Sequence, residues 1–129
     1  MGQLGGKRMK PNFVSIGAGS AALGVALGAF GAHALRGMVG PAQLALWETA
    51  TRYWFIGALG TLLFGLFSHK SERGSAAGWL LLGGSALFAG SLYALALGAP
   101  RAVGAITPFG GAGLIAGFVC FAISSQRRS

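Results

Sequence analysis

Four long apolar stretches, each with small residues four positions apart, make up most of this 129-residue chain. An apolar stretch of about 20 residues can cross a membrane as a helix. Small residues on one side of such a helix leave a groove in which a neighbouring backbone packs closely, and this packing drives helix association in lipid. We therefore expect a bundle of membrane-spanning helices. The four ladders of small residues are Ser20, Gly24, Gly28 and Ala32, then Gly57, Thr61 and Gly65, then Ala86, Gly90, Ala94 and Gly98, and finally Gly113 and Gly117.

The composition favours a membrane protein over a soluble one. Hydrophobic residues make up 53% of the chain and charged residues 9%, whereas a soluble domain carries about 25% charged residues. The formal net charge is +8, but the charges lie at the chain ends and between the apolar stretches, without a basic stripe or a nucleic-acid-binding module. We interpret them as topology signals and as contacts to anionic headgroups. The expected partner is therefore membrane lipid rather than nucleic acid.

The apolar stretches predict an all-α fold with four transmembrane helices over residues 13–123, between a basic tail at 1–12 and another at 124–129. The second and fourth stretches are short, about 24 Å as helices, against a hydrocarbon layer of about 30 Å. An amphipathic lead-in helix over 41–52 is expected to lengthen the second, and Thr107-Pro108 is typical of a helix start with Thr as N-cap. The expected helices cover about 13–35, 50–68, 78–98 and 107–124.

The positive charges predict the orientation of the bundle, because Lys and Arg accumulate on the cytoplasmic side of membrane proteins. Seven lie in the two tails and the middle loop, against three, Arg36, Arg52 and Arg101, on the other side. Both termini are therefore expected to face the cytoplasm, or the matrix of an organelle. Alternatively, the first stretch is a signal peptide cleaved near Ala32-His33-Ala34, but it is about twice as long as a signal-peptide core. The seven are Lys7, Arg8, Lys10, Lys70, Arg73, Arg127 and Arg128.

Few side chains in the apolar stretches are suited to chemistry. Apart from His33, their cores lack the ionisable side chains that mark proton relays and ion paths in membranes. Glu48, one of two acidic residues, precedes Arg52 by four positions, which favours a weak ion pair on a helix. Cys120 is the only cysteine, and no Cys/His cluster has the spacing of a zinc site. We expect no metal, no cofactor and no enzymatic activity.

Four short motifs occur in order along the chain: GAFGAHAL at 28–35, WETATRY at 47–53, LFAGSLY at 87–93 and TPFGG at 107–111. Together they resemble the small membrane-protein family known as domain of unknown function 423, which includes transmembrane protein 256. The likeness covers roughly residues 13–123. It implies four transmembrane helices and a place in the bacterial inner membrane or, in eukaryotes, in mitochondria. The role of the family is not established, so the resemblance implies no catalytic residue.

One position departs from the family pattern. Members often carry a second histidine four residues after the tyrosine of the second motif, and this chain has Gly57 there. A metal or haem site built on paired histidines is therefore disfavoured. Gly57 instead joins a ladder of small residues, which favours helix packing. We expect the packing of the bundle to centre on Gly24, Gly28, Gly57, Gly65, Gly90, Gly113 and Gly117.

The expected topology brings all four motifs to one level near the outer side of the membrane. The first motif ends its helix there, the second and fourth begin theirs there, and the third lies in the outer half of its helix. Tyr93 would lie about 9 Å below the outer boundary, where its hydroxyl needs a hydrogen-bond partner. We therefore hypothesise a shallow, outward-facing polar site lined by His33, Arg52, Tyr93 and Thr107.

Three functions are compatible with these features. The first is a non-catalytic structural or accessory subunit, with other membrane proteins or further copies of the chain as partners. The second is a small-solute channel or transporter that uses the outward-facing polar site. The third is a cofactor-binding membrane protein that uses His33. Tight small-residue faces and the lack of a polar core favour the first. The expected location is the bacterial inner membrane, with the mitochondrial inner membrane as the alternative.

Overall fold

The structure, a computed structural model, describes residues 12–68 and 76–128, with side chains to residue 126. This part of the chain forms four long helices, two short 3₁₀ helices and no strand. Each long helix, with its adjoining 3₁₀ turn where it has one, is long and apolar enough to cross a membrane. The expected all-α fold with four transmembrane helices is thereby confirmed. The elements are α2 (Phe13–His33), η1 (Leu35–Gly37), α3 (Pro41–Ser68), α4 (Ala76–Ala96), η2 (Arg101–Ala105) and α5 (Thr107–Arg128).

Part of the expected organisation lies outside the described residues. The N-terminal tail up to residue 11 is one such segment, and the middle-loop residues Lys70 and Arg73 belong to another. The backbone of the expected C-terminal tail continues α5 to Arg128. The structure therefore tells where the helices begin and end, and the charge bias between the two sides stays a prediction.

α3 is one continuous helix of 28 residues, so the expected lead-in over 41–52 and the second span are not separate elements. It begins at Pro41, whose fixed φ suits the first turn and whose missing N–H is not needed there. At 1.5 Å per residue the helix is about 42 Å long, more than a hydrocarbon layer requires. Arg52, which the sequence places just before the second span, therefore lies well inside the helix.

Local signals in the sequence account for the helix ends. The side chain of Asn12 accepts a hydrogen bond from the backbone nitrogen of Ser15 at 3.1 Å and so caps the start of α2. After α4, Gly98 adopts a positive φ of 104°. The backbone nitrogen of Ala99 bonds to the carbonyl of Ala94, and that of Gly98 bonds to Leu95. This is a Schellman motif, which stops the helix and favours glycine at the left-handed position.

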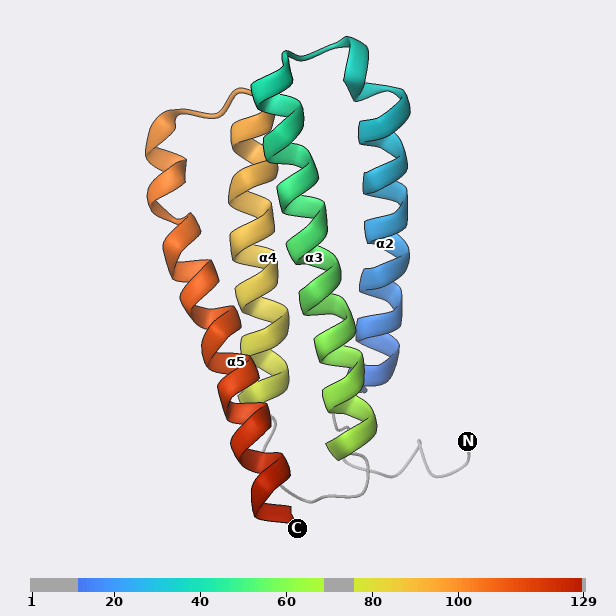
Figure 1. Cartoon of the computed structure of the whole chain (residues 1–129), viewed down its shortest axis with the longest axis vertical. Coiled ribbons are helices and arrows are strands. Elements are labelled where there is room, and N and C mark those ends of the chain that lie inside the picture. The colour runs from blue at the N-terminus through green and yellow to red at the C-terminus, as the bar shows by residue number, and fades with distance from the viewer. Residues whose placement is uncertain (1–11, 69–75, 129) are drawn as a thin grey trace, which may run out of the picture.

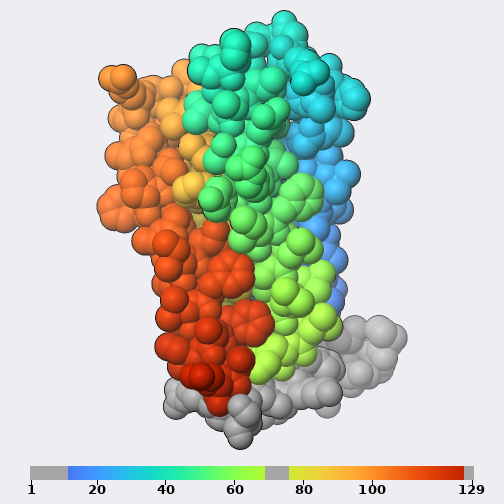
Figure 2. All heavy atoms as spheres, in the orientation of Figure 1, coloured from blue at the N-terminus to red at the C-terminus, as the bar shows by residue number. Residues whose placement is uncertain are grey.

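The four helices run antiparallel, and each packs mainly against its neighbours in the chain (Figure 1). We call the end where α2 begins, α3 ends, α4 begins and α5 ends the terminal end, and the end with η1 and η2 the connection end. α5 is inclined to α4, and only its C-terminal half reaches α3, whereas its N-terminal half stands apart from α3 (Figure 2). The bundle is therefore an open row of helices in which α2 and α5 each keep a wide exposed face.

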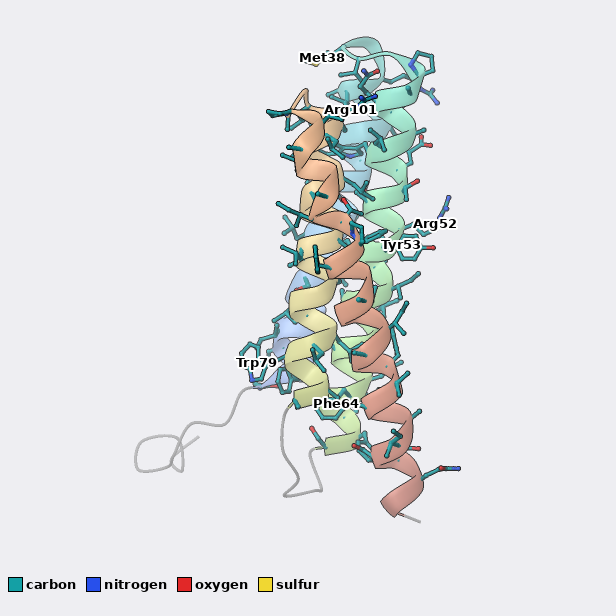
Figure 3. All side chains as sticks on the ribbon, turned by 90° about the vertical axis from the view of Figure 1, so that its left-hand side faces the viewer. Met38, Arg52, Tyr53, Phe64, Trp79 and Arg101 are labelled. Carbon is teal, nitrogen blue, oxygen red and sulfur yellow. The ribbon has the colours of Figure 1, made fainter. Side chains whose placement is uncertain are left out.

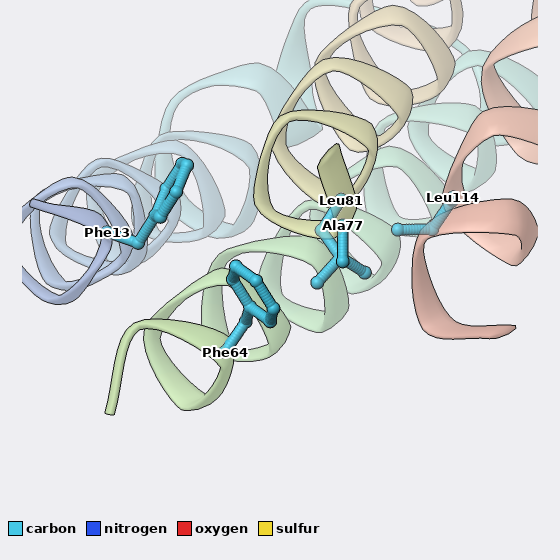
Figure 4. Packing of buried hydrophobic residues seen from close by; sticks show 5 residues of the cluster. All are labelled: Phe13, Phe64, Ala77, Leu81 and Leu114. Carbon is cyan, nitrogen blue, oxygen red and sulfur yellow. The ribbon is translucent and has the colours of Figure 1, made fainter. Parts of the chain in front are cut away.

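A hydrophobic cluster of residues from all four helices packs the terminal half of the bundle (Figure 4). Phe13 and Phe64 meet edge to face with ring centroids 5.8 Å apart, and Phe64 meets Phe121 at 5.4 Å. Such edge-to-face pairs add stabilisation beyond simple contact. The buried members of the cluster are Phe13, Phe64, Ala77, Leu81 and Leu114.

Three of the four glycine ladders face a neighbouring helix. A methyl group on Gly65 would lie 2.6 Å from the backbone nitrogen of Val14, and one on Gly117 would lie 2.8 Å from that of Leu81. Gly113 packs against Gly84, and Gly57 packs against the side chain of Ser85. On α2, the equivalent position on Gly24 meets the rings of Trp54 and Phe55 at 2.9 Å, and that on Gly28 meets Thr51 at 3.6 Å.

The third ladder is a correction to the sequence analysis. Ala86 and Gly90 are exposed, and nothing lies within 4 Å of a methyl group placed on Gly90. A step of four residues turns a helix by 400°, so a strict four-residue ladder drifts by about 40° at each step. α4 instead buries a stripe with alternating steps of four and three residues. The stripe consists of Ser85, Ala89, Leu92 and Ala96.

Candidate functional site

Two tryptophans of α3 bind the backbone of α2. The indole nitrogen of Trp47 donates to the carbonyl of Leu27 at 2.8 Å, and that of Trp54 donates to the carbonyl of Ser20 at 2.7 Å. A methyl group on Gly31 would lie 2.6 Å from the ring of Trp47, so glycine is what lets the indole reach the helix backbone. The groove on α2 therefore holds aromatic side chains with a polar edge rather than a bare helix backbone.

A polar cluster joins α3 to α4 in the connection half. The hydroxyl of the buried Thr51 lies 2.6 Å from the hydroxyl of Tyr93 and 3.0 Å from the carbonyl of Trp47. Thr51 has one hydroxyl proton, and it donates that proton to the carbonyl, so Tyr93 is the donor to Thr51. The rings of Trp47 and Tyr93 also pack together with centroids 4.4 Å apart. The hydroxyl of Tyr93 thus has the partner that its depth demands.

A second hydroxyl pair joins α4 to α5. Ser91 donates to the carbonyl of Phe88 at 2.9 Å, and its oxygen lies 2.5 Å from the hydroxyl of Thr107. Thr107 is therefore the donor in the pair by the same count of protons. Thr107 is the first residue of α5, so this bond fixes the start of α5 against the side of α4.

The structure separates the four residues that the sequence analysis places in one outward-facing site. Tyr93 binds to α3 and Thr107 binds to Ser91 on the other side of α4, because two residues of a helix turn its direction by about 200°. His33, at the end of α2, is exposed, and so is Arg52. Arg52 points away from the other helices (Figure 3). The four side chains therefore occupy different faces of the bundle, and two of them are already hydrogen-bonded.

Metal or cofactor binding finds few candidate ligands here. Within residues 12–68 and 76–126, no three His, Cys, Asp or Glu side chains lie together. At Gly57, even a methyl group would collide with the side chain of Ser85. A histidine has no room at this position, so the glycine serves close contact between α3 and α4.

The sequence analysis missed the partners that complete the polar clusters. Trp47, Thr51 and Trp54 follow one another at steps of four and three, which is the spacing of one helix face. Gly24, Gly28 and Gly31 on α2 have the same alternation. The matching steps on the aromatic face of α3 and the glycine face of α2 were the sequence signal that indicates these contacts.

The polar side chains buried in the described part of the bundle are all hydrogen-bonded within it. Every buried side-chain nitrogen or oxygen atom in the described residues has a hydrogen-bond partner. The hydroxyl protons of four of these residues are used within the protein, namely those of Thr51, Tyr93, Ser91 and Thr107. In lipid, hydrogen bonds of this kind hold helices together at a typical net gain of about 0.6 kcal/mol each. The arrangement can fix three helices in register.

Comparisons with known proteins identify relatives of the chain. The family model described as "Protein of unknown function (DUF423)" matches residues 27–111. A UPF0382 membrane protein of Staphylococcus epidermidis is 43% identical over 116 residues, covering 89% of this chain and 95% of its own. One from Bacillus subtilis is 40% identical over 118 residues, covering 89% and 96%. No solved structure matches the chain significantly. With a family match over most of its length and full-length relatives that are membrane proteins, the chain belongs to the DUF423 family.

Proposed function

We propose that the protein is a non-catalytic structural or accessory subunit of the bacterial inner membrane, which acts by assembling into a larger membrane complex or a homo-oligomer. The open row of helices carries this proposal. α2 packs extensively only on α3, and α5 extensively only on α4. Apolar side chains on both outer helices are left exposed, including Val25, Ile115 and Phe109. Lipid or a partner protein can cover these faces without any change to the bundle.

Charge bias supports an orientation with both termini in the cytoplasm. Seven Lys and Arg residues belong to the tails and the loop between α3 and α4, against three, Arg36, Arg52 and Arg101, in α3 and the two connections. Because the positive-inside rule counts charges in short loops near the helix ends, this difference favours a cytoplasmic terminal end. In this orientation η1 and η2 lie on the opposite side of the membrane.

The transport alternative receives less support from the packing. A path for a small solute needs a wettable channel along the helices. Glycine contacts between α3 and α4 at Gly57, and between α4 and α5 at Gly84, leave no room for even a methyl group. A polar path would have to form between copies of the chain. A cofactor site on His33 would likewise need ligands from another molecule, since no metal-binding group of three surrounds it in the described residues.

The test is to isolate the protein from its native membrane with its partners attached. The tagged chain is extracted in mild detergent, sized by native electrophoresis, and its companions are identified by mass spectrometry. We expect a complex several times larger than the 13.0 kDa chain, with a fixed ratio of components. An unrelated tagged four-helix membrane protein, extracted in parallel, identifies proteins that bind any such bait.

Two results would contradict the proposal. One is a monomer in the native extract, with no companion above the control. The other is a purified chain that moves small solutes across liposomes at a rate that depends on the chain. The second result would support the channel or transporter, and the polar residues between copies would then be the first place to look for its path.

A further inference from the structure

One face of α3 packs against no other helix among the described residues, and it carries an unusual combination of side chains. It follows steps of three and four residues along the helix, and all of its members are exposed. Its terminal half is apolar, with Ile56 39%, Leu59 49%, Leu63 55% and Leu66 54% exposed. Its connection half carries two opposite charges. We call it the α3 face, made up of Ala45, Glu48, Arg52, Ile56, Leu59, Leu63 and Leu66.

Arg52 lies within the span rather than at its end. Its neighbour Thr51 packs beside Gly28, which lies five residues before the end of α2. Arg52 is therefore roughly 8 Å inside the level at which α2 ends. Figure 3 shows its side chain pointing away from the other helices. Charged side chains at this depth normally face a bundle interior, pair with one another or extend towards the headgroups, so an Arg on an outer face is a candidate for contact with an outside partner.

The acidic residue on the same face tells which partner fits. Glu48 is the only acidic side chain in the described part of the chain, and it is exposed one turn from Arg52. An anionic lipid headgroup would attract Arg52 but would be repelled by Glu48. A surface with both charges in the same arrangement satisfies both. The α3 face of another copy is such a surface.

We propose that two copies of the chain associate along the α3 face about a two-fold axis normal to the membrane. Such an axis places equal residues of the two copies at equal depths. The long side chain of Arg52 spans the one-turn step to Glu48 of the second copy, and the reverse pair forms by symmetry. Below the charges, the Ile and Leu residues recur every three or four positions, which suits two helices crossing at about 20°. The proposal rests on the proposed function and specifies its homo-oligomeric form.

The charges allow a test by complementation. Glu48→Lys makes the α3 face wholly basic, and Arg52→Glu makes it wholly acidic. Each variant alone should repel itself, whereas a mixture of the two should form a mixed dimer. The double variant Glu48→Arg with Arg52→Glu restores both charges in exchanged positions and should dimerise again. Because the four proteins differ only at exposed positions, helix content by circular dichroism serves as the folding control.

Association is read in native membranes by disulfide cross-linking. Each protein carries Leu59→Cys in a Cys120→Ala background, and the two charge variants carry different tags. Matched controls place the cysteine at Val25 on α2 or Ile115 on α5, which are exposed to a similar or greater extent. We expect a strong dimer band from Leu59→Cys alone, a roughly tenfold loss in each single charge variant, and recovery in the mixture and in the double variant.

Other outcomes overturn the proposal. Cross-linking at position 59 no stronger than at positions 25 and 115 would show that α3 faces lipid. If the yield of cross-linked dimer were the same in all charge variants, Glu48 and Arg52 would not contribute to association. A response of the single variants that follows the anionic lipid content of liposomes, without recovery in the mixture, would assign Arg52 to a lipid headgroup. In each case a native complex with a different protein would leave the proposed function intact.

Discussion

The two halves of this bundle are held together in different ways. The terminal half is packed by aromatic rings and by glycines that touch a neighbouring backbone, as at Gly65 and Gly117. The connection half has a close glycine contact of its own, at Gly110, and adds hydrogen bonds from side chains to a neighbouring helix, through Trp47, Tyr93 and Thr107. In lipid, apolar burial contributes little to helix association, so contact quality and hydrogen bonds are the two remaining sources of stability. We therefore expect the connection half to be more sensitive than the terminal half to the loss of a polar group.

The largest effect is expected from Gly84→Ala, compared with the same change at the preceding residue, Gly83. A methyl group on Gly84 would collide with the backbone of Gly113 and Leu114, which cannot move without separating α5 from α4. Nothing lies within 4 Å of the equivalent position on Gly83. We expect Gly84→Ala to lower the free energy of unfolding by about 3 kcal/mol, and Gly83→Ala to leave it unchanged or slightly raised.

The measurement is reversible unfolding in mixed micelles, with helix content as the signal. The pair of variants shares one helix and one change of volume, so any difference reports the contact with α5. Equal losses at the two positions would mean that the close contact between α4 and α5 does not stabilise the bundle.

Removing an aromatic ring from the terminal half should have the next largest effect. Phe64 is 2% exposed and packs against Phe13 and Phe121, whereas Phe109 is 73% exposed. We expect Phe64→Ala to lower the free energy of unfolding by about 2 kcal/mol, below the range for Phe→Ala in soluble cores, because lipid removes the water-transfer part of the penalty. Phe109→Ala should be close to neutral in the same unfolding assay. A large loss from Phe109→Ala would indicate that another molecule covers it.

The sequence predicted the fold well because its main determinants are additive along the chain. Apolar length and helix-end signals such as Pro41 act locally, and the four helices follow from them. The face that each helix buries is harder to predict, because it depends on how many neighbouring helices pack against it. α4 lies between α3 and α5, so it buries a broad arc, and the ladder through Gly90 falls in the remaining exposed part.

For Tyr93 the sequence predicted the need of its hydroxyl for a partner, but not the direction in which the side chain points. The depth of Tyr93 correctly indicated that its hydroxyl needs a partner, because depth depends only on residue count. Its partner, Thr51, stands next to the expected Arg52, and one residue turns a helix by about 100°. That turn separates a buried hydroxyl from an exposed guanidinium. Helix phase relative to a neighbour is a tertiary property, and a single sequence fixes it only weakly.

The hydrogen bond between Thr51 and Tyr93 gives a smaller effect that tests the connection half. A double-mutant cycle with Thr51→Val and Tyr93→Phe removes each hydroxyl with little change of shape. We expect a coupling energy of about 0.6 kcal/mol, within the range measured between membrane helices. The same two changes combined pairwise with Phe64→Leu should be additive, because Phe64 belongs to the terminal cluster. Coupling to Phe64 of similar size would mean that the two halves do not act separately.

The smallest effect is expected from Gly90→Ala. The sign of the change in the free energy of unfolding tells whether the position is open or closely packed. In the isolated chain the position is exposed and open, so Gly90→Ala should raise the free energy of unfolding by about 0.5 kcal/mol, since alanine has the better helix propensity. The same variant in native membranes should leave the size of any complex unchanged if this part of α4 faces lipid. A stable isolated chain that no longer assembles would instead show that a partner helix approaches Gly90 closely. The ladder through Gly90, which is exposed within one chain, would then pack against a second molecule. Such an intermolecular contact would depend on shape, as the glycine contacts of the terminal half do.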